Sequence, residues 1–176
     1  FNRLSNILKS AGAVLGKQTV INYVGYMMDS YMLFTLQNYA AKLVEKETSP
    51  KYYFMDTGLL GLMLMDCSSA QLENMVAIEL IRRYGRENVF YFEKNVEIDF
   101  YVPEEKLAIQ VSLQVLDQID TREREIGAFV KLKNFIGDAT CLLITNSEEE
   151  ELDYEGVHVS VVPVWKWLLQ NRKQDI

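Results

Sequence analysis

The chain has 176 residues, of which 49% are apolar, and its 18 basic and 25 acidic side chains give a formal net charge of −7. This composition indicates a globular protein with a substantial core and excludes a disordered chain. No apolar run reaches the ~18 residues that a membrane-spanning helix needs, so we expect no membrane contact. Two cysteines, Cys67 and Cys141, stand in no metal-binding or disulfide pattern, which predicts a protein of the reducing cytoplasm.

The charges are unevenly distributed along the chain. Residues 1–51 hold six basic and three acidic side chains, a net charge of +3, whereas residues 52–176 hold 12 basic and 22 acidic side chains, a net charge of −10. Contacts with nucleic acid are therefore expected in the first part. The whole chain is too acidic to bind DNA strongly without specific contacts.

Residues 1–60 are predicted to form a winged-helix-like domain. Leu4, Ile7 and Leu8 are spaced as one face of a helix, and a second helix is expected to begin at Lys17. An apolar stripe on that second helix consists of Val20, Ile21, Val24, Met27 and Met28. Residues 31–36 and 51–55 are expected to be paired strands, joined by the polar stretch 42–50. The alternative is a plain helical hairpin that leads into a sheet.

Residues 61–176 are predicted to form a second, α/β domain with a mixed sheet. Residues 59–65 form a short apolar segment, and residues 71–84 and 120–135 are expected helices. The expected strands are residues 89–92, 97–102, 107–113, 140–145 and 157–162, with a last helix from Val164. Residues 148–151 are an acidic run that we predict to be a solvated loop. The early strands alternate and residues 141–144 are all apolar, which favours a hairpin edge and a buried parallel centre.

Acidic and polar side chains share a face of two neighbouring strands in this domain. Alternation places Glu97 and Asp99 on one face of their strand, and Gln110 and Ser112 on one face of the next. If these strands pair as a hairpin, the two polar faces meet. The helix before them carries Glu73 at the edge of its apolar stripe. An ordinary solvent-exposed hairpin face is the alternative to a functional site.

This arrangement resembles the PD-(D/E)XK nuclease fold. In that family a helix glutamate, a strand aspartate and a Glu-x-Lys pair hold Mg²⁺ and activate water. By position, Glu73 matches the helix glutamate and Asp99 the aspartate, whereas Gln110 and Ser112 replace the second acid and the lysine. The resemblance therefore implies a vestigial, inactive catalytic site at these four residues. Glu97 and Asp99 are the remaining candidates for a weak Mg²⁺ site.

The residue type that has no evident replacement in this site is the lysine. Lys94 lies nearby in the sequence, but no pattern places it among the carboxylates. Ser112 cannot supply a positive charge. The loss predicts that the domain does not cut nucleic acid.

Five short segments carry a wider resemblance, in the same order along the chain. They are KYYFMDTGLL at residues 51–60, ENMVAIEL at 73–80, EIDF at 97–100, IQVS at 109–112 and TRERE at 121–125. They resemble the C-terminal region of a family of prokaryotic AAA+-type ATP-binding proteins, which join a P-loop ATPase, a winged helix and a nuclease-like domain. The resemblance implies ATP and Mg²⁺ for a parent protein. No Gly-x-x-x-x-Gly-Lys-Ser/Thr motif is present, so we expect no ATP cofactor in these residues.

The function expected from these observations is a non-catalytic C-terminal module that binds DNA or a protein partner, next to the N-terminal ATPase domain of a parent chain. Lys17, Gln18, Thr19 and Asn22 on the second helix are the candidates for contact with a DNA groove. An ordinary polar helix face is the alternative for these four. Two further interpretations are an active Mg²⁺-dependent nuclease with an altered site and a structural or oligomerisation domain.

Overall fold

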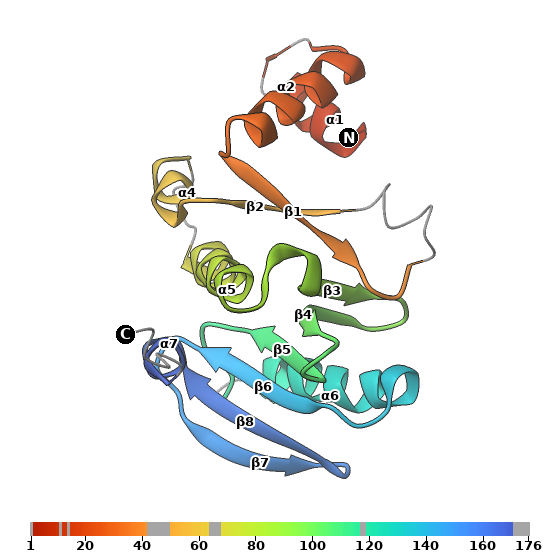
Figure 1. Cartoon of the computed structure of the whole chain (residues 1–176), viewed down its shortest axis with the longest axis vertical. Coiled ribbons are helices and arrows are strands. Elements are labelled where there is room, and N and C mark those ends of the chain that lie inside the picture. Colours follow the sequence, from red (N-terminus) through yellow and green to blue (C-terminus); the bar gives the residue numbers. More distant parts are fainter. Residues whose placement is uncertain are drawn as a thin grey trace.

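The computed structural model describes residues 2–10, 12–13, 15–41, 50–63, 68–116 and 119–170. It shows an α/β protein with a mixed sheet of eight strands in the order β2-β1-β3-β4-β5-β6-β8-β7 (Figure 1). The strands are β1 (Leu33–Asn38), β2 (Lys51–Phe54), β3 (Phe90–Glu93), β4 (Glu97–Val102), β5 (Leu107–Val111), β6 (Thr140–Thr145), β7 (Glu150–Tyr154) and β8 (Val157–Pro163). The helices are α1 (Asn2–Ser10), α2 (Lys17–Asp29), α4 (Thr57–Met63), α5 (Ser68–Tyr84), α6 (Ile119–Ile136) and α7 (Val164–Leu169), with a 3₁₀ turn η1 (Arg86–Asn88).

The sheet combines parallel and antiparallel pairs of strands. β6 pairs in parallel with β5 and with β8, and its residues Cys141, Leu143 and Ile144 are buried. β4 pairs antiparallel with β3 and with β5, and β7 pairs antiparallel with β8 at one edge. The predicted hairpin and buried parallel strand are thus present in a mixed sheet, but the antiparallel β3–β4–β5 segment lies inside the sheet and not at its edge, because β1 and β2 continue the sheet beyond β3.

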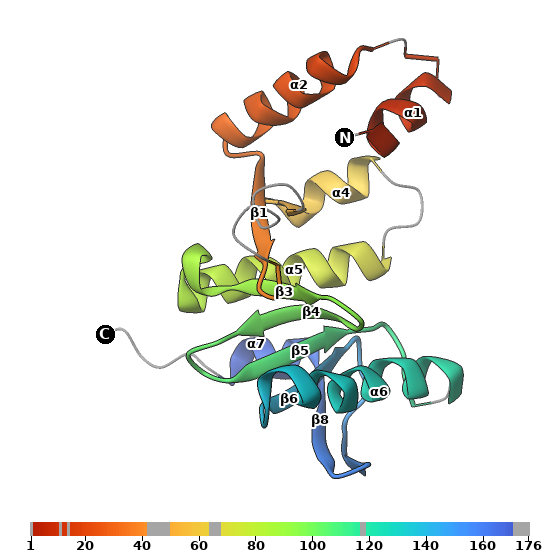
Figure 2. The ribbon, with the colours of Figure 1, turned by 90° about the vertical axis from the view of Figure 1, so that its right-hand side faces the viewer.

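Helices cover the two faces of the sheet. The apolar stripe of α5 and Trp167 of α7 pack in one cluster with Phe100 and Ile109. Phe129 and Leu132 of α6 pack in a second cluster on the other face, against Leu143 and Val159. Figure 2 shows α6 in front of the strands and α7 behind them. The fold thus has three layers, as expected for strands that are buried on both faces.

The β1–β2 hairpin joins the first 60 residues to this sheet. β1 pairs antiparallel with β2 from Leu33–Phe54 to Leu36–Lys51, and it pairs in parallel with β3 at Gln37–Phe90 and Asn38–Tyr91. The two strands predicted as a wing thus belong to the main sheet, with β2 at its edge and β1 between β2 and β3. The α1–α2 pair lies beyond this hairpin, at the end of the molecule farthest from β7 (Figure 1).

One element contradicts the sequence prediction, and another had no secondary structure assigned to it. The acidic run at residues 148–151 was expected to be a loop, but Glu150 and Glu151 begin strand β7. β7 is an edge strand that buries Leu152 alone among its five residues, so backbone pairing with β8 holds it despite its acidic composition. The apolar segment near residue 60 is helix α4, and the Asp56 carboxylate accepts the Gly58 N–H at 2.7 Å at its start. Most of the polar stretch 42–50 lies outside the described residues.

In the described part of the chain, no helix combines the length and apolarity that a membrane crossing requires.

A buried amide ties α5 to β2, and its loss has a defined expected result. Asn74 Oδ1 accepts the Phe54 N–H at 2.7 Å, and Asn74 Nδ2 donates to the Phe54 carbonyl at 3.0 Å. Asn74→Ala is expected to lower the free energy of unfolding by about 1–3 kcal/mol, because it leaves both backbone groups without their partner. Urea unfolding of this variant and of Asn22→Ala, an exposed control on α2, measures the effect. Equal stability of the two variants would contradict this role.

Candidate functional site

The β4–β5 hairpin, α5 and α6 enclose a polar pocket of about 430 Å³. Its lining residues are Glu73, Val96, Glu97, Asp99, Gln110, Val111, Arg124, Glu125, Ala128 and Lys131. The structure thus brings together Glu73, Glu97, Asp99 and Gln110, and the alternation of the two strands predicts the last three of these. Ser112 does not line the pocket, and its hydroxyl donates to the Gln114 carbonyl at 3.2 Å.

The pocket forms where the backbones of β4 and β5 separate. Paired residues run from Val102–Leu107 to Phe100–Ile109, and side chains replace the backbone ladder beyond that point. Gln110 Oε1 accepts the Asp99 N–H at 2.9 Å, and Gln110 Nε2 donates to the Glu97 carbonyl at 3.1 Å. Asp99 Oδ2 in turn accepts the Val111 N–H at 2.9 Å. The Gln110 amide therefore links β5 to the backbone of β4, and its carbonyl oxygen already accepts a hydrogen bond.

Glu73 on α5 is held by a tyrosine of the β1–β2 hairpin. The buried Tyr53 hydroxyl donates to Glu73 Oε1 at 2.8 Å, and the Tyr53 ring stacks on Phe34 with centroids 5.6 Å apart. Burial, together with the charge of Glu73, raises the pKa of Tyr53 far above its ordinary value. Tyr53 therefore remains a hydrogen-bond donor to this carboxylate and fixes its direction.

Lys51 supplies a positive charge to this pocket from the start of β2. Its Nζ lies 2.6 Å from Glu97 Oε1 and 3.9 Å from Asp99 Oδ1, and 5.2 Å from the centre of the Tyr91 ring. Burial acts to lower the pKa of Lys51, but the hydrogen bond to Glu97 and the negative charges of the pocket outweigh it and raise the pKa. Lys51 therefore stays an ammonium ion.

Lys51 was not predicted as a site residue, because its partner Glu97 is 46 positions away and no local pattern joins the two. Lys94, the lysine near the carboxylates in the sequence, instead lies over the Phe135 ring, 5.4 Å from its centre.

Asp99 is the most perturbed carboxylate of the pocket. Its side chain is 18% exposed. Burial, and then the negative charge of Glu73, raise the pKa of Asp99 to about 7, while Lys51 and the Val111 N–H act in the opposite direction. Near neutral pH this carboxyl group is therefore divided between its protonated and ionised forms.

Helix α6 forms one side of the pocket and carries an ion pair there. Glu125 is 8% exposed, and its Oε1 accepts hydrogen bonds from Arg124 Nε at 3.1 Å and Nη2 at 2.6 Å. The Arg124 side chain itself is 73% exposed. This pair adds charges of both signs to the rim, so the pocket is mixed in charge rather than uniformly acidic.

The side chains of the pocket do not fit the Mg²⁺ site of an active nuclease. Mg²⁺ prefers several carboxylate and water oxygens around it. Here the Gln110 oxygen and one Asp99 oxygen accept backbone N–H groups, and the Lys51 ammonium lies against Glu97 and Asp99. Among the described residues, no three His, Cys, Asp or Glu side chains come together so as to hold a metal ion.

The proposed DNA-contacting residues lie on α2, well away from this pocket (Figure 1). Lys17, Gln18 and Asn22 are exposed, with Gln18 Nε2 donating to Asn22 Oδ1 at 3.1 Å, whereas Thr19 is half-buried. The same helix exposes the aromatic rings of Tyr23 and Tyr26, at 52% and 64%. α2 therefore presents a polar and aromatic surface to solvent.

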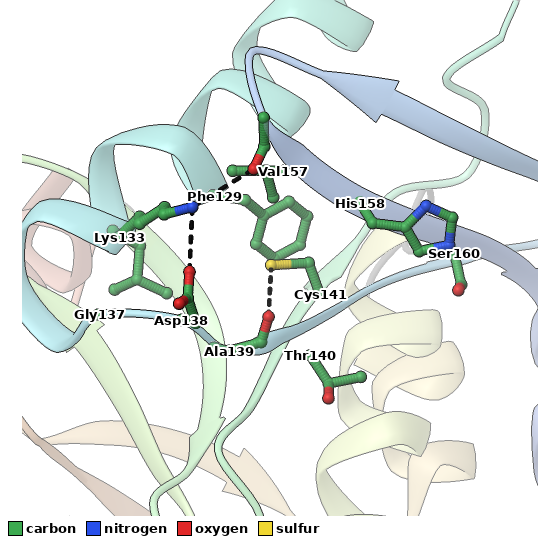
Figure 3. A pocket seen from close by; sticks show the side chains of 12 residues that line it. Phe129, Lys133, Gly137, Asp138, Ala139, Thr140, Cys141, Val157, His158 and Ser160 are labelled. Atoms are coloured by element: carbon green, nitrogen blue, oxygen red, sulfur yellow. Dashed lines mark hydrogen bonds and ion pairs between the residues drawn. The ribbon is translucent and has the colours of Figure 1, made fainter.

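A second pocket, of about 280 Å³, lies between the end of α6 and strands β6 and β8 (Figure 3). Lys133 at its rim pairs with Asp138 at 3.0 Å. Burial raises the pKa of the Cys141 thiol to about 11, so this thiol is protonated at neutral pH and is a poor nucleophile. His158 is held by Asp153 and Glu151 of β7, at 2.9 and 3.1 Å. These polar groups are engaged in separate pairs.

Comparisons with known proteins support no activity directly. A family model described as a domain of unknown function, DUF8612, matches residues 2–71, from α1 to the beginning of α5. The chain is 31% identical over 177 residues to the uncharacterized protein MJ1544 of Methanocaldococcus jannaschii, and the match covers 95% of this chain. The chain spans 40% of the length of that relative. No solved structure matches the chain.

Proposed function

We propose that this chain is a non-catalytic binding module from the C-terminal region of an AAA+-type ATPase. In this proposal residues 1–60 are a winged helix and residues 61–176 are a PD-(D/E)XK nuclease-like domain with a degenerate site. ATP and Mg²⁺ belong to the ATPase domain of the parent protein. The archaeal relative, of which the matched segment is 40%, has the length for such a further domain. The thiol chemistry of the chain, with a free buried Cys141, suits the cytoplasm.

The proposed lack of catalysis rests on one observation. The polar groups of the pocket are bonded to one another and to the backbone. Hydrolysis by a metal-dependent nuclease requires carboxylate oxygens open to a cation and to water. Gln110 stands in place of the second acid and is bound to the β4 backbone through both atoms of its amide. Lys51 neutralises Glu97 directly at 2.6 Å. The pocket is therefore arranged as a stable polar network.

DNA is the partner that the α2 surface favours. Lys17 provides a positive charge at the first turn, and the amides of Gln18 and Asn22 can donate and accept hydrogen bonds at base edges. Exposed Tyr23 and Tyr26 add rings on which a base or sugar can pack. The acidic remainder of the chain repels phosphate, so the binding is expected to be local and strongly reduced by salt.

The test is fluorescence-anisotropy binding to duplex, single-stranded and branched DNA over a salt series, with Mg²⁺ present and products resolved on a denaturing gel. We expect salt-sensitive binding and intact DNA. The double variant Lys17→Ala, Asn22→Ala is expected to bind DNA about tenfold more weakly. The slope of the logarithm of the binding constant against the logarithm of the salt concentration is expected to fall in magnitude by about one, because one phosphate contact is lost. Lys133→Ala, an exposed lysine on α6, is the matched control and should bind like the unchanged chain.

The other outcomes separate the remaining interpretations. Cleavage that disappears in Asp99→Ala would establish an altered-site nuclease, in which Lys51 supplies the amine that Ser112 cannot. Absence of DNA binding at low salt would instead assign the α2 surface to a protein partner or to oligomerisation. Sedimentation of the chain alone then separates these two alternatives. An oligomer indicates self-association, and a monomer indicates a different protein as the partner.

A further inference from the structure

Two carboxylates that line the pocket, Glu97 and Asp99, lie beside a cation of the chain itself, the Lys51 ammonium. The Lys51 ammonium lies 2.6 Å from Glu97 Oε1 and 3.9 Å from Asp99 Oδ1. Glu73 lines the same pocket. At neutral pH an ammonium among these groups offsets negative charge that would otherwise gather in a partly buried space. The side chains of Glu97 and Asp99 thus meet the chain's own lysine where a nuclease of this type holds a metal.

Lys51 is positioned for this role by the fold. It is paired with Leu36 at the end of the β1–β2 hairpin, and the hairpin is attached to the sheet by the parallel pairing of β1 with β3. The Lys51 side chain is 25% exposed, and its ammonium also lies over the Tyr91 ring at 5.2 Å. These contacts hold the ammonium at the pocket, since a half-buried, paired lysine has fewer alternative positions than a surface lysine.

We propose that the Lys51 ammonium takes the place of a divalent cation beside Glu97 and Asp99, and that it keeps Mg²⁺ from binding between these two carboxylates. An ammonium and a Mg²⁺ ion compete for the same carboxylate oxygens, and two cations this close repel each other strongly. The Glu97 side chain is 59% exposed, so it can turn toward Asp99 once the ammonium is removed. This role of Lys51 does not depend on which partner α1 and α2 bind.

The experiment measures Mn²⁺ binding to the whole chain by calorimetry and by the electron paramagnetic resonance signal of free Mn²⁺. Lys51→Met is expected to bind Mn²⁺ about tenfold or more tightly than the unchanged chain, a difference of about 1.4 kcal/mol. Lys51→Arg, which keeps the charge, and Lys94→Met, which removes an exposed lysine outside the pocket, are expected to show no gain. Adding Asp99→Asn to Lys51→Met is expected to abolish the gain.

Two results would overturn the proposal. One is equal Mn²⁺ affinity of the unchanged chain and Lys51→Met, which would mean that the ammonium does not exclude the ion. The other is a folded Lys51→Met and a folded Lys51→Gln that both fail to bind Mn²⁺. If both variants are unfolded without metal, refolding on addition of Mn²⁺ supports the proposal and failure to refold overturns it. None of these measurements involves DNA, so the result is independent of the proposed binding function.

Discussion

Replacement of Phe129 by alanine is expected to lower the free energy of unfolding by roughly 3–5 kcal/mol, the range for truncating a large aromatic side chain in a core. Phe129 lies in the middle of α6 and is 1% exposed. It packs in the cluster that contains Leu143 of β6 and Val159 of β8, two strands that pair in parallel. The variant removes most of this side chain from a close-packed layer and leaves a cavity beneath α6.

Phe135→Ala on the same helix is the matched control. Phe135 is 40% exposed and contacts Phe92 with ring centroids 5.6 Å apart. Its truncation removes less buried area, so the expected loss is about 1 kcal/mol. Urea or thermal unfolding, followed by circular dichroism, compares the two variants. A similarly small loss of unfolding free energy in both variants would mean that Phe129 contributes little to the core between α6 and the sheet.

Asp99→Asn is expected to change how stability depends on pH. The pKa of Asp99 in the folded chain is about 7, above its ordinary value of 3.8, so the folded state binds this proton more tightly than the unfolded state does. The stability that this group contributes is therefore fully present below pH 4 and is lost as the pH rises toward 7 and above. The asparagine variant has no such loss, because its side chain does not ionise.

The quantity to measure is the free energy of unfolding of the unchanged chain minus that of Asp99→Asn, at a series of pH values from 4 to 8. This difference is expected to fall with rising pH by an amount on the order of 4 kcal/mol at most, since one pKa unit corresponds to about 1.4 kcal/mol. Glu79, whose pKa is lowered by its hydrogen bond to Arg82, acts in the opposite direction but is present in both proteins and cancels. A difference that stays constant across this range would contradict the raised pKa, as would an NMR titration of the Asp99 carboxyl with a midpoint near 4.

Local periodicity in the sequence was sufficient for most elements of the α/β domain. The strands predicted at residues 97–102 and 140–145 have those bounds in the structure, because their side-chain patterns match a half-buried hairpin strand and a fully buried parallel strand. The helix predicted at 71–84 is α5, which begins three residues earlier at Ser68. Alternation also placed Glu97, Asp99 and Gln110 close together, since it fixes which face of a strand each side chain occupies.

The tertiary structure decided how these groups are used. Lys51 reaches the carboxylates because the β1–β2 hairpin joins the main sheet, and a pairing between segments so far apart leaves no local pattern in the sequence. Gln110 resembles a replaced ligand in the motif, but its amide bonds to β4 where the backbones part. β7 was missed for a related reason, since its backbone pairing with β8 outweighs its acidic composition. The sequence by itself determined the order and faces of most elements. The charge pairs and the pairing of the edge strand depend on distances in space, which only the folded chain sets.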